Sequence, residues 1–186
     1  MPASLSSLFE AAEHGGQAVS NDLFSALYSE LHRLARCQLG HQVPVSIGAT
    51  TLLHQAYIEM AGRSSVAFPD RSRFMAYASR VMRGLIIDHA RTRNAQKRGG
   101  QFHITSADVA VAHPADYTEL EQLGAALDQL AEIDSALAEV VDMKFFCGFT
   151  FAEISAMKNL SERTVQRQWE KARIYLHRKL SRDFEG

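Results

Sequence analysis

The chain has 186 residues, of which 46% are hydrophobic and 22% charged, a composition typical of a globular protein. No apolar run approaches the roughly 18 residues of a membrane span, and the N-terminus lacks the pattern of a secretory signal, so a cytoplasmic protein is expected. Cys37 and Cys147 lie far apart in the sequence and the histidines are scattered, which predicts neither a disulfide framework nor a metal site. No cofactor is expected.

The net charge of −1 conceals a segregation of charge along the chain. Residues 71–98 carry eight basic residues and one acidic residue, whereas residues 108–142 carry nine acidic residues and no Lys or Arg. Residues 143–186 are again basic, with nine Lys or Arg against five acids. Two basic blocks around an acidic one indicate two surfaces for polyanions joined by a segment that repels nucleic acid. Solvated helix faces are the simpler alternative.

Apolar residues recur at helical spacing through most of the sequence and predict an all-α fold. A first helix begins near Asn21 or Asp22, a second opens at Thr50 or Thr51, and a third runs from Arg71 or Ser72 to about Asn94. Two further stripes follow in 120–130 and 137–145, then short helices at about 150–157 and 162–181. We therefore expect two small helical domains, 20–95 and 119–183, with an N-terminal tail at 1–19 and a flexible acidic linker at 96–118.

The third predicted helix separates apolar and basic residues on a helical wheel. One face carries Phe74, Tyr77, Ala78, Val81 and Leu85, and the opposite side carries an arginine ridge of Arg73, Arg80, Arg83 and Arg91. Basic residues at both ends extend this charge: Arg71, Arg93, Lys97 and Arg98. Such a ridge suits a nucleic-acid backbone, duplex or single-stranded.

Two residues near this helix have alternative roles. Phe68, in the preceding loop, can stack on an unpaired base or pin the loop to the core. Asp88 is expected to pair with Arg33 or Arg36 of the first helix.

Residues 151–169 have the spacing of a helix-turn-helix motif. Asn159 stands where the turn needs a left-handed residue, Leu160 is expected to plug the turn, and Ser161 to cap the second helix. Val165, Trp169, Ala172 and Leu176 form the buried stripe, so Trp169 is expected in the core. A helical hairpin with a solvated face is the alternative, but the exposed side is rich in Arg and Gln, which favours DNA binding.

The predicted DNA contacts divide by chemistry. Arg163 and Gln166 can read base edges, whereas Lys171 and Arg173 suit phosphates. Ser161, Thr164 and Arg167 complete the predicted contact set. No phosphate-binding loop, HExxH, GxSxG or dense acidic cluster occurs, so an enzyme is not expected.

Three segments together resemble one family. Residues 73–91, continuing to Lys97-Arg-Gly-Gly, resemble the promoter-melting helix of extracytoplasmic-function (ECF) sigma factors, which belong to the sigma-70 family. Residues 164–173 resemble their recognition helix, and Leu52-Leu-His-Gln-Ala-Tyr-Ile their second helix. The resemblance covers about residues 20–182 and implies an alternative sigma factor that works with RNA polymerase core and promoter DNA.

The resemblance also implies roles for each half. The first half would dock on the β′ clamp and hold the melted minus-ten strand, with a base flipped into the loop at 63–73. It assigns clamp docking to His54, Gln55, Ile58 and Glu59, and strand contacts to Phe68, Arg71, Arg73, Arg80, Arg83 and Arg91. The second half would bind the minus-thirty-five duplex and the β flap.

One departure from the family pattern concerns the start of the second helix. Relatives carry acids there, whereas this chain has Gly48-Ala-Thr-Thr-Leu-Leu-His-Gln, a variant that resembles the subgroup linked to Ser/Thr protein kinases. Phosphorylation of Thr50 or Thr51 would restore the charge, although either threonine can instead be a simple N-cap. A stand-alone helix-turn-helix regulator would explain residues 150–180 equally well but leaves the arginine ridge unexplained.

Overall fold

The computed structural model describes residues 7–8, 10, 21–40, 47–62, 68, 70–98 and 114–183, except the side chains of 93–94, 96–98, 114–117 and 182–183. The secondary structure in these ranges is helical, without strands, which confirms the predicted all-α fold. The elements are α2 (Asn21–Gly40), α3 (Ala49–Ala61), α4 (Arg71–Arg98), α5 (Pro114–Ile133), α6 (Ser135–Val141), the short π-helix η1 (Asp142–Phe146), α7 (Phe151–Lys158) and α8 (Glu162–Asp183).

Two helix boundaries differ from the sequence prediction. α4 continues to Arg98, and α5 begins at Pro114 rather than Glu119, where proline is favoured because the first helical N–H needs no partner. Only 99–113 of the predicted linker therefore separate the two helices, and these residues lie outside the described ranges, as do most of the tail at 1–19 and residues 63–67 and 69 of the predicted base-binding loop.

The chain changes register at η1. The Cys147 N–H donates to the Asp142 carbonyl at 2.9 Å, five residues back, so this turn holds one more residue than an α-turn. The apolar spacing placed Phe145 in the stripe at 137–145, but the wider turn directs Phe146 into the core and leaves Phe145 39% exposed.

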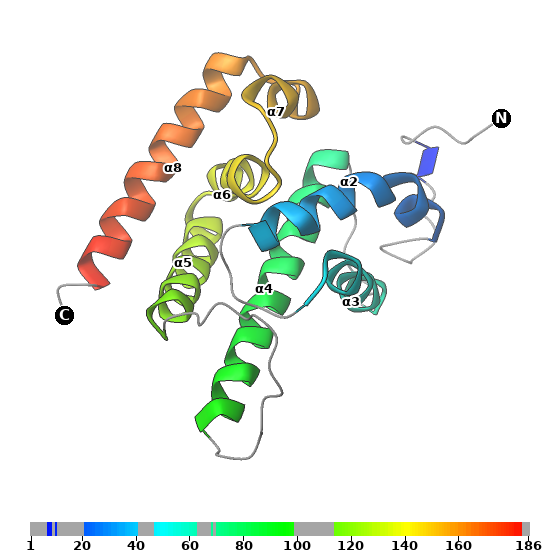
Figure 1. Cartoon of the computed structure of the whole chain (residues 1–186). Coiled ribbons are helices and arrows are strands. Elements are labelled where there is room, and N and C mark those ends of the chain that lie inside the picture. The colour runs from blue at the N-terminus through cyan, green and yellow to red at the C-terminus, as the bar shows by residue number, and fades with distance from the viewer. Residues whose placement is uncertain are drawn as a thin grey trace.

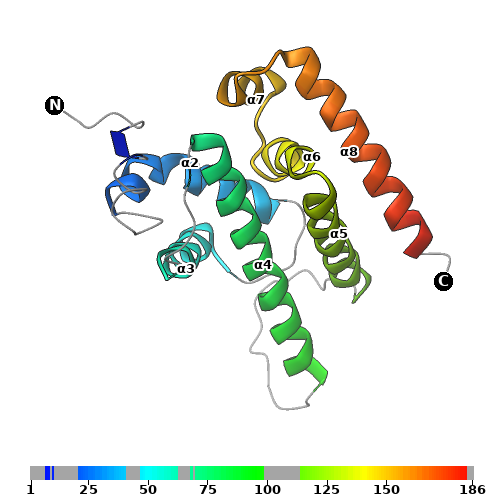
Figure 2. The same cartoon turned by 180° about the vertical axis from the view of Figure 1, so that it is seen from behind.

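α4 is the central helix of the molecule. Figure 1 shows it in green with α3 on one side and α5, α6 and α8 on the other, while α2 crosses it, and Figure 2 shows the same order from behind. It contacts α2, α3, α5, α7 and η1. This position explains why α4 buries Met75, Met82 and Ile86 in addition to the predicted apolar face.

The larger hydrophobic core contains residues from both halves of the chain. Leu27 and Leu31 of α2 belong to the same buried cluster as Val140 of α6 and Met143 of η1, all with no exposed surface. A second cluster, built on Leu127, Leu130 and Ala172, joins α5 and α8 within the carboxy-terminal half. The two predicted helical sets thus pack against each other through a common core.

We expect a single cooperative thermal unfolding transition because the larger core spans both halves. Leu27→Ala in α2 and Val140→Ala in α6 each remove fully buried methyl groups and should lower the stability of that transition, by roughly 2–4 kcal/mol for the leucine and less for the valine. Circular dichroism and calorimetry measure the effect. Two transitions, each shifted by only one of these variants, would contradict a common core.

Candidate nucleic-acid interface

The turn between α7 and α8 has helix-turn-helix geometry. Thr150 and Glu153 form a reciprocal capping box at the start of α7, in which hydrogen bonds from Thr150 lower the pKa of the Glu153 carboxyl. Asn159 ends α7 with φ 51° and ψ 44°, which confirms the left-handed residue expected there. The backbone N–H of Thr164 donates to the Ser161 hydroxyl at 3.1 Å, so Ser161 caps α8 as predicted.

Two details of this motif differ from the prediction. Leu160 does not plug the turn, since it is 38% exposed. Ala152, for which the helical spacing predicts an inward position, faces solvent. Phe151 packs against the core instead and meets Trp169 edge-on, with ring centroids 6.5 Å apart. This aromatic pair thus contributes to the contact between α7 and α8.

α8 directs its predicted DNA-contacting side chains toward solvent. Arg163, Gln166, Arg167, Lys171 and Arg173 are all exposed, while Val165 and Ala172 are fully buried on the opposite side. Trp169 is half-buried and contacts both hydrophobic clusters, in keeping with the core role predicted for it.

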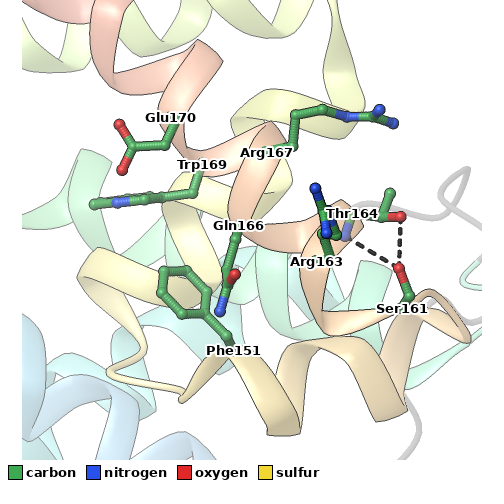
Figure 3. A pocket seen from close by; sticks show the side chains of 8 residues that line it. All are labelled: Phe151, Ser161, Arg163, Thr164, Gln166, Arg167, Trp169 and Glu170. Atoms are coloured by element: carbon green, nitrogen blue, oxygen red, sulfur yellow. Dashed lines mark hydrogen bonds between the residues drawn. The ribbon is translucent and has the colours of Figure 1, made fainter.

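An open groove of about 570 Å³ follows the amino end of α8. Figure 3 shows its lining, in which the Trp169 and Phe151 rings lie beside Gln166, and Ser161 bonds to Thr164. Arg163 and Arg167 supply positive charge and Gln166 an amide that can both donate and accept. This combination suits base edges and phosphates in a major groove.

The arginine ridge of α4 is only partly exposed. Arg73 and Arg80 face solvent, and Arg71 bonds to Glu30 of α2 at 2.6 Å. Arg91 is 60% exposed and donates to Glu121 of α5 at 2.7 Å, a bond that raises the pKa of its guanidinium. The side chains of Arg93, Lys97 and Arg98 lie outside the described part of the structure.

The position of Arg83 differs from the prediction that it belongs to an exposed arginine ridge. It lies opposite the apolar face, as the wheel required, but it is only 4% exposed because η1 and α5 cover it. Its guanidinium bonds to Asp142 at 2.5 Å and to Asp128 at 3.2 Å, and it stands over the Phe146 ring at 5.2 Å. In this arrangement of the helices Arg83 cannot reach a DNA strand.

Asp142 is the buried partner of Arg83. Burial raises the pKa of its carboxyl to about 6, and the charge of Arg83 opposes this rise only in part. Sequence reasoning assigned no role to Asp142, Asp128 or Glu121, the acids that meet the ridge. The acidic block at 108–142, which contains no Lys or Arg, was the sequence signal that could have pointed to these residues.

The structure decides between the two predicted roles of Phe68 and corrects the predicted partner of Asp88. Phe68 is 5% exposed and packs on the rings of Phe74 and Tyr77 at centroid distances of 5.2 and 5.0 Å, so it pins the loop to the core and is not open to a base. Asp88 is exposed and pairs with Arg91 at 3.6 Å, not with Arg33 or Arg36. Arg33 instead reaches Glu153 and the Phe149 ring of the second half.

α3 presents the predicted docking and phosphorylation residues along one helix. Ile58 is 70% exposed and His54 faces solvent, whereas Gln55 bonds to His89 of α4 and Glu59 is half-buried. Thr50 and Thr51 are exposed in the first turn. Gly48, not a threonine, occupies the N-cap position without a side-chain cap, so the simple N-cap role of the threonines is wrong. The Thr50 hydroxyl lies 3.5 Å from His32 Nε2.

Asp142→Asn should change how the free energy of unfolding depends on pH. Because burial raises the folded pKa above the ordinary value of about 4, the folded state binds this proton first as the pH falls. The resulting stability is fully present below about pH 4 and lost as the pH rises through about 6, up to roughly 3 kcal/mol relative to the variant. Urea denaturation between these pH values measures the difference.

The matched control is Asp128→Asn, which removes the exposed partner of Arg83. This variant should keep most of the wild-type pH dependence, because burial is the main cause of the raised Asp142 pKa and the charge of Asp128 is the smallest. A stability difference between wild type and Asp142→Asn that is constant with pH would show that the carboxyl does not titrate in this window.

Comparison with known proteins identifies the family of the chain. A family model described as ECF sigma factor matches residues 2–182. No curated protein and no solved structure gives a significant match. Within the described residues no helix is long and apolar enough to cross a membrane, and no group of side chains could hold a metal ion. ECF sigma factors are DNA-binding initiation factors whose partners are RNA polymerase core and promoter DNA. Because the match spans nearly the whole chain, the chain belongs to the ECF sigma factors and serves transcription initiation as an alternative sigma factor.

Proposed function

We propose that the two halves of the chain contact different parts of a promoter. The second half, 119–183, would read the minus-thirty-five duplex through α8, and the first half, 20–95, would hold the melted minus-ten strand along α4. The observation that carries this proposal is the capped helix-turn-helix, with Arg163 and Gln166 exposed beside an open groove. Ser161, Thr164, Arg167, Lys171 and Arg173 would contact the neighbouring phosphates.

On α4, Arg73 and Arg80 are the proposed first contacts with the melted strand because both are exposed. Arg71, Arg83 and Arg91 would join them once their acidic partners are released. The β′ clamp would dock on α3 through His54 and Ile58, whose exposure supports this role, with Gln55 and Glu59 beside them. A protein that binds polymerase core would act in the cytoplasm.

Transcription with core polymerase tests the division of labour. Arg163→Ala and Gln166→Ala should each weaken the binding free energy for the upstream element by roughly 1–3 kcal/mol per lost base contact and change which upstream sequence is preferred. Arg80→Ala should instead impair strand opening. Footprinting reports upstream binding, and permanganate reactivity of promoter thymines reports opening. Equal loss of upstream binding from all three variants would contradict the assignment, and tight duplex binding without core would favour a stand-alone regulator.

A phosphorylation switch at Thr50 or Thr51 is the second part of the proposal. The first turn of α3 holds no acid, both hydroxyls are exposed, and Gly48 already occupies the cap position. A phosphate would add about −1.5 to −2 of charge at the positive end of the helix, where anions are favoured. It would supply the anion that a basic clamp surface requires, with a Ser/Thr protein kinase as the partner.

The switch predicts that a phosphorylated protein binds core more tightly than the unmodified chain. Thr50→Glu or Thr51→Glu should raise core affinity at least severalfold over the uncharged Gln variants of the same length, because only Glu restores the charge. Pull-down of purified core measures this, and Ala variants incubated with a partner kinase identify the residue modified. If Glu and Gln variants bind alike and neither Ala change alters transcription in cells, the switch is wrong.

A further inference from the structure

Three carboxylates of the second half lie on the arginine ridge of the first half. Asp142 of η1 and Asp128 of α5 bind Arg83, and Glu121 of α5 binds Arg91, at distances of 2.5, 3.2 and 2.7 Å. These acids come from the block at 108–142 that lacks any basic residue. Three acids of this block therefore face the most basic helix of the chain.

α5 follows α4 closely along this contact. A Cβ atom on Gly124 of α5 would lie 2.9 Å from Cδ1 of Ile87, so glycine permits the approach. Figures 1 and 2 both show α5 beside the middle of α4. The contact thus combines ion pairs with close packing of Gly124 against Ile87.

We propose that the free protein masks its own strand-binding surface, with carboxylates of α5 and η1 occupying the places of DNA phosphates on Arg83 and Arg91. This inference rests on the proposed role of α4 in holding the melted strand. We call the arrangement in which α5 and η1 pack on α4 the closed form. In it Arg83 is 4% exposed, so the second half must leave α4 before this arginine meets DNA. Because these arginines are paired with carboxylates, the free protein also binds nucleic acid nonspecifically with lower affinity.

The mask covers one DNA surface and spares the other. Arg163 and Gln166 of α8 stay exposed in the closed form, and so does Arg80 of α4. The closed protein can therefore meet duplex through α8 while the deeper part of the ridge is covered. Two of the three pairs are partly exposed and contribute little, so the main cost of opening is to uncover the shared core and the buried Arg83–Asp142 pair.

Two double variants of α5 test the mask. Glu121→Gln/Asp128→Asn removes two acids that touch α4. Glu119→Gln/Glu132→Gln removes two exposed acids of the same helix that make no ion pair or hydrogen bond with the described side chains of α4. Both lose the same charge, so general electrostatics cancel. Fluorescence anisotropy with a fluorescein-labelled single-stranded DNA of about 20 nucleotides measures binding by the full chain. The first variant should bind about three- to tenfold more tightly than the second.

Cys147 reports opening independently of DNA. It is 2% exposed, burial raises the pKa of its thiol, and it is the sole thiol in a Cys37→Ser background because the chain has two cysteines. It belongs to the core formed with α2 and α4, so separation of the halves must uncover it. A maleimide reagent should label it severalfold faster in the Glu121→Gln/Asp128→Asn variant than in the control.

The outcomes separate this inference from the proposed function. If both double variants bind DNA and label alike while the protein still supports transcription with core, the mask is wrong and the function stands. If single-stranded DNA saturates the wild type without any faster labelling of Cys147, the ridge works in the closed form and the mask is again wrong. Failure of Arg80→Ala to affect promoter opening would instead overturn the function assigned to α4.

Discussion

Burial of the Arg83 guanidinium is the constraint on which the packing of the two halves depends. A charge with 4% exposure needs a partner of opposite charge, because an unpaired ion in the protein interior costs several kcal/mol. Asp142 is that partner, and it is itself 1% exposed at the start of η1. If the two side chains separate, water must hydrate both charged groups. α4 and η1 therefore stay in contact unless water enters between them.

The π-turn places this carboxylate and the aromatic ring beside it. The extra residue in the turn at Asp142–Phe146 brings Phe146 inward, under the guanidinium of Arg83, while Asp142 accepts its hydrogen bond. An α-turn would direct a different side chain toward α4. Local backbone geometry of five residues thus determines whether the arginine of a distant helix is covered.

The two DNA-facing surfaces differ in how they are held. The groove beside α8 is shaped by local features, which are the Thr150 capping box, the left-handed Asn159 and the Ser161 cap, all within 12 residues of one another. The ridge on α4 depends on contacts between residues 30 to 59 positions apart, such as Arg91 with Glu121 and Arg83 with Asp142. Surfaces built on local contacts stay formed when domains move, whereas surfaces covered by distant segments change with them.

The sequence by itself determined the helices, the turn and the chemistry of the exposed side of α8. Apolar spacing located each helix to within a few residues, and Asn159 and Ser161 marked the turn, because these features depend on neighbours along the chain. Only the tertiary structure decided that Arg83 and Phe68 are buried, that Asp88 turns to Arg91, and that Gly48 rather than a threonine caps α3. A helical wheel shows which side of α4 faces away from its first partners, but not that a second set of helices covers that side. Burial there depends on where α5 and η1 pack, and pattern within a single helix holds no information on that.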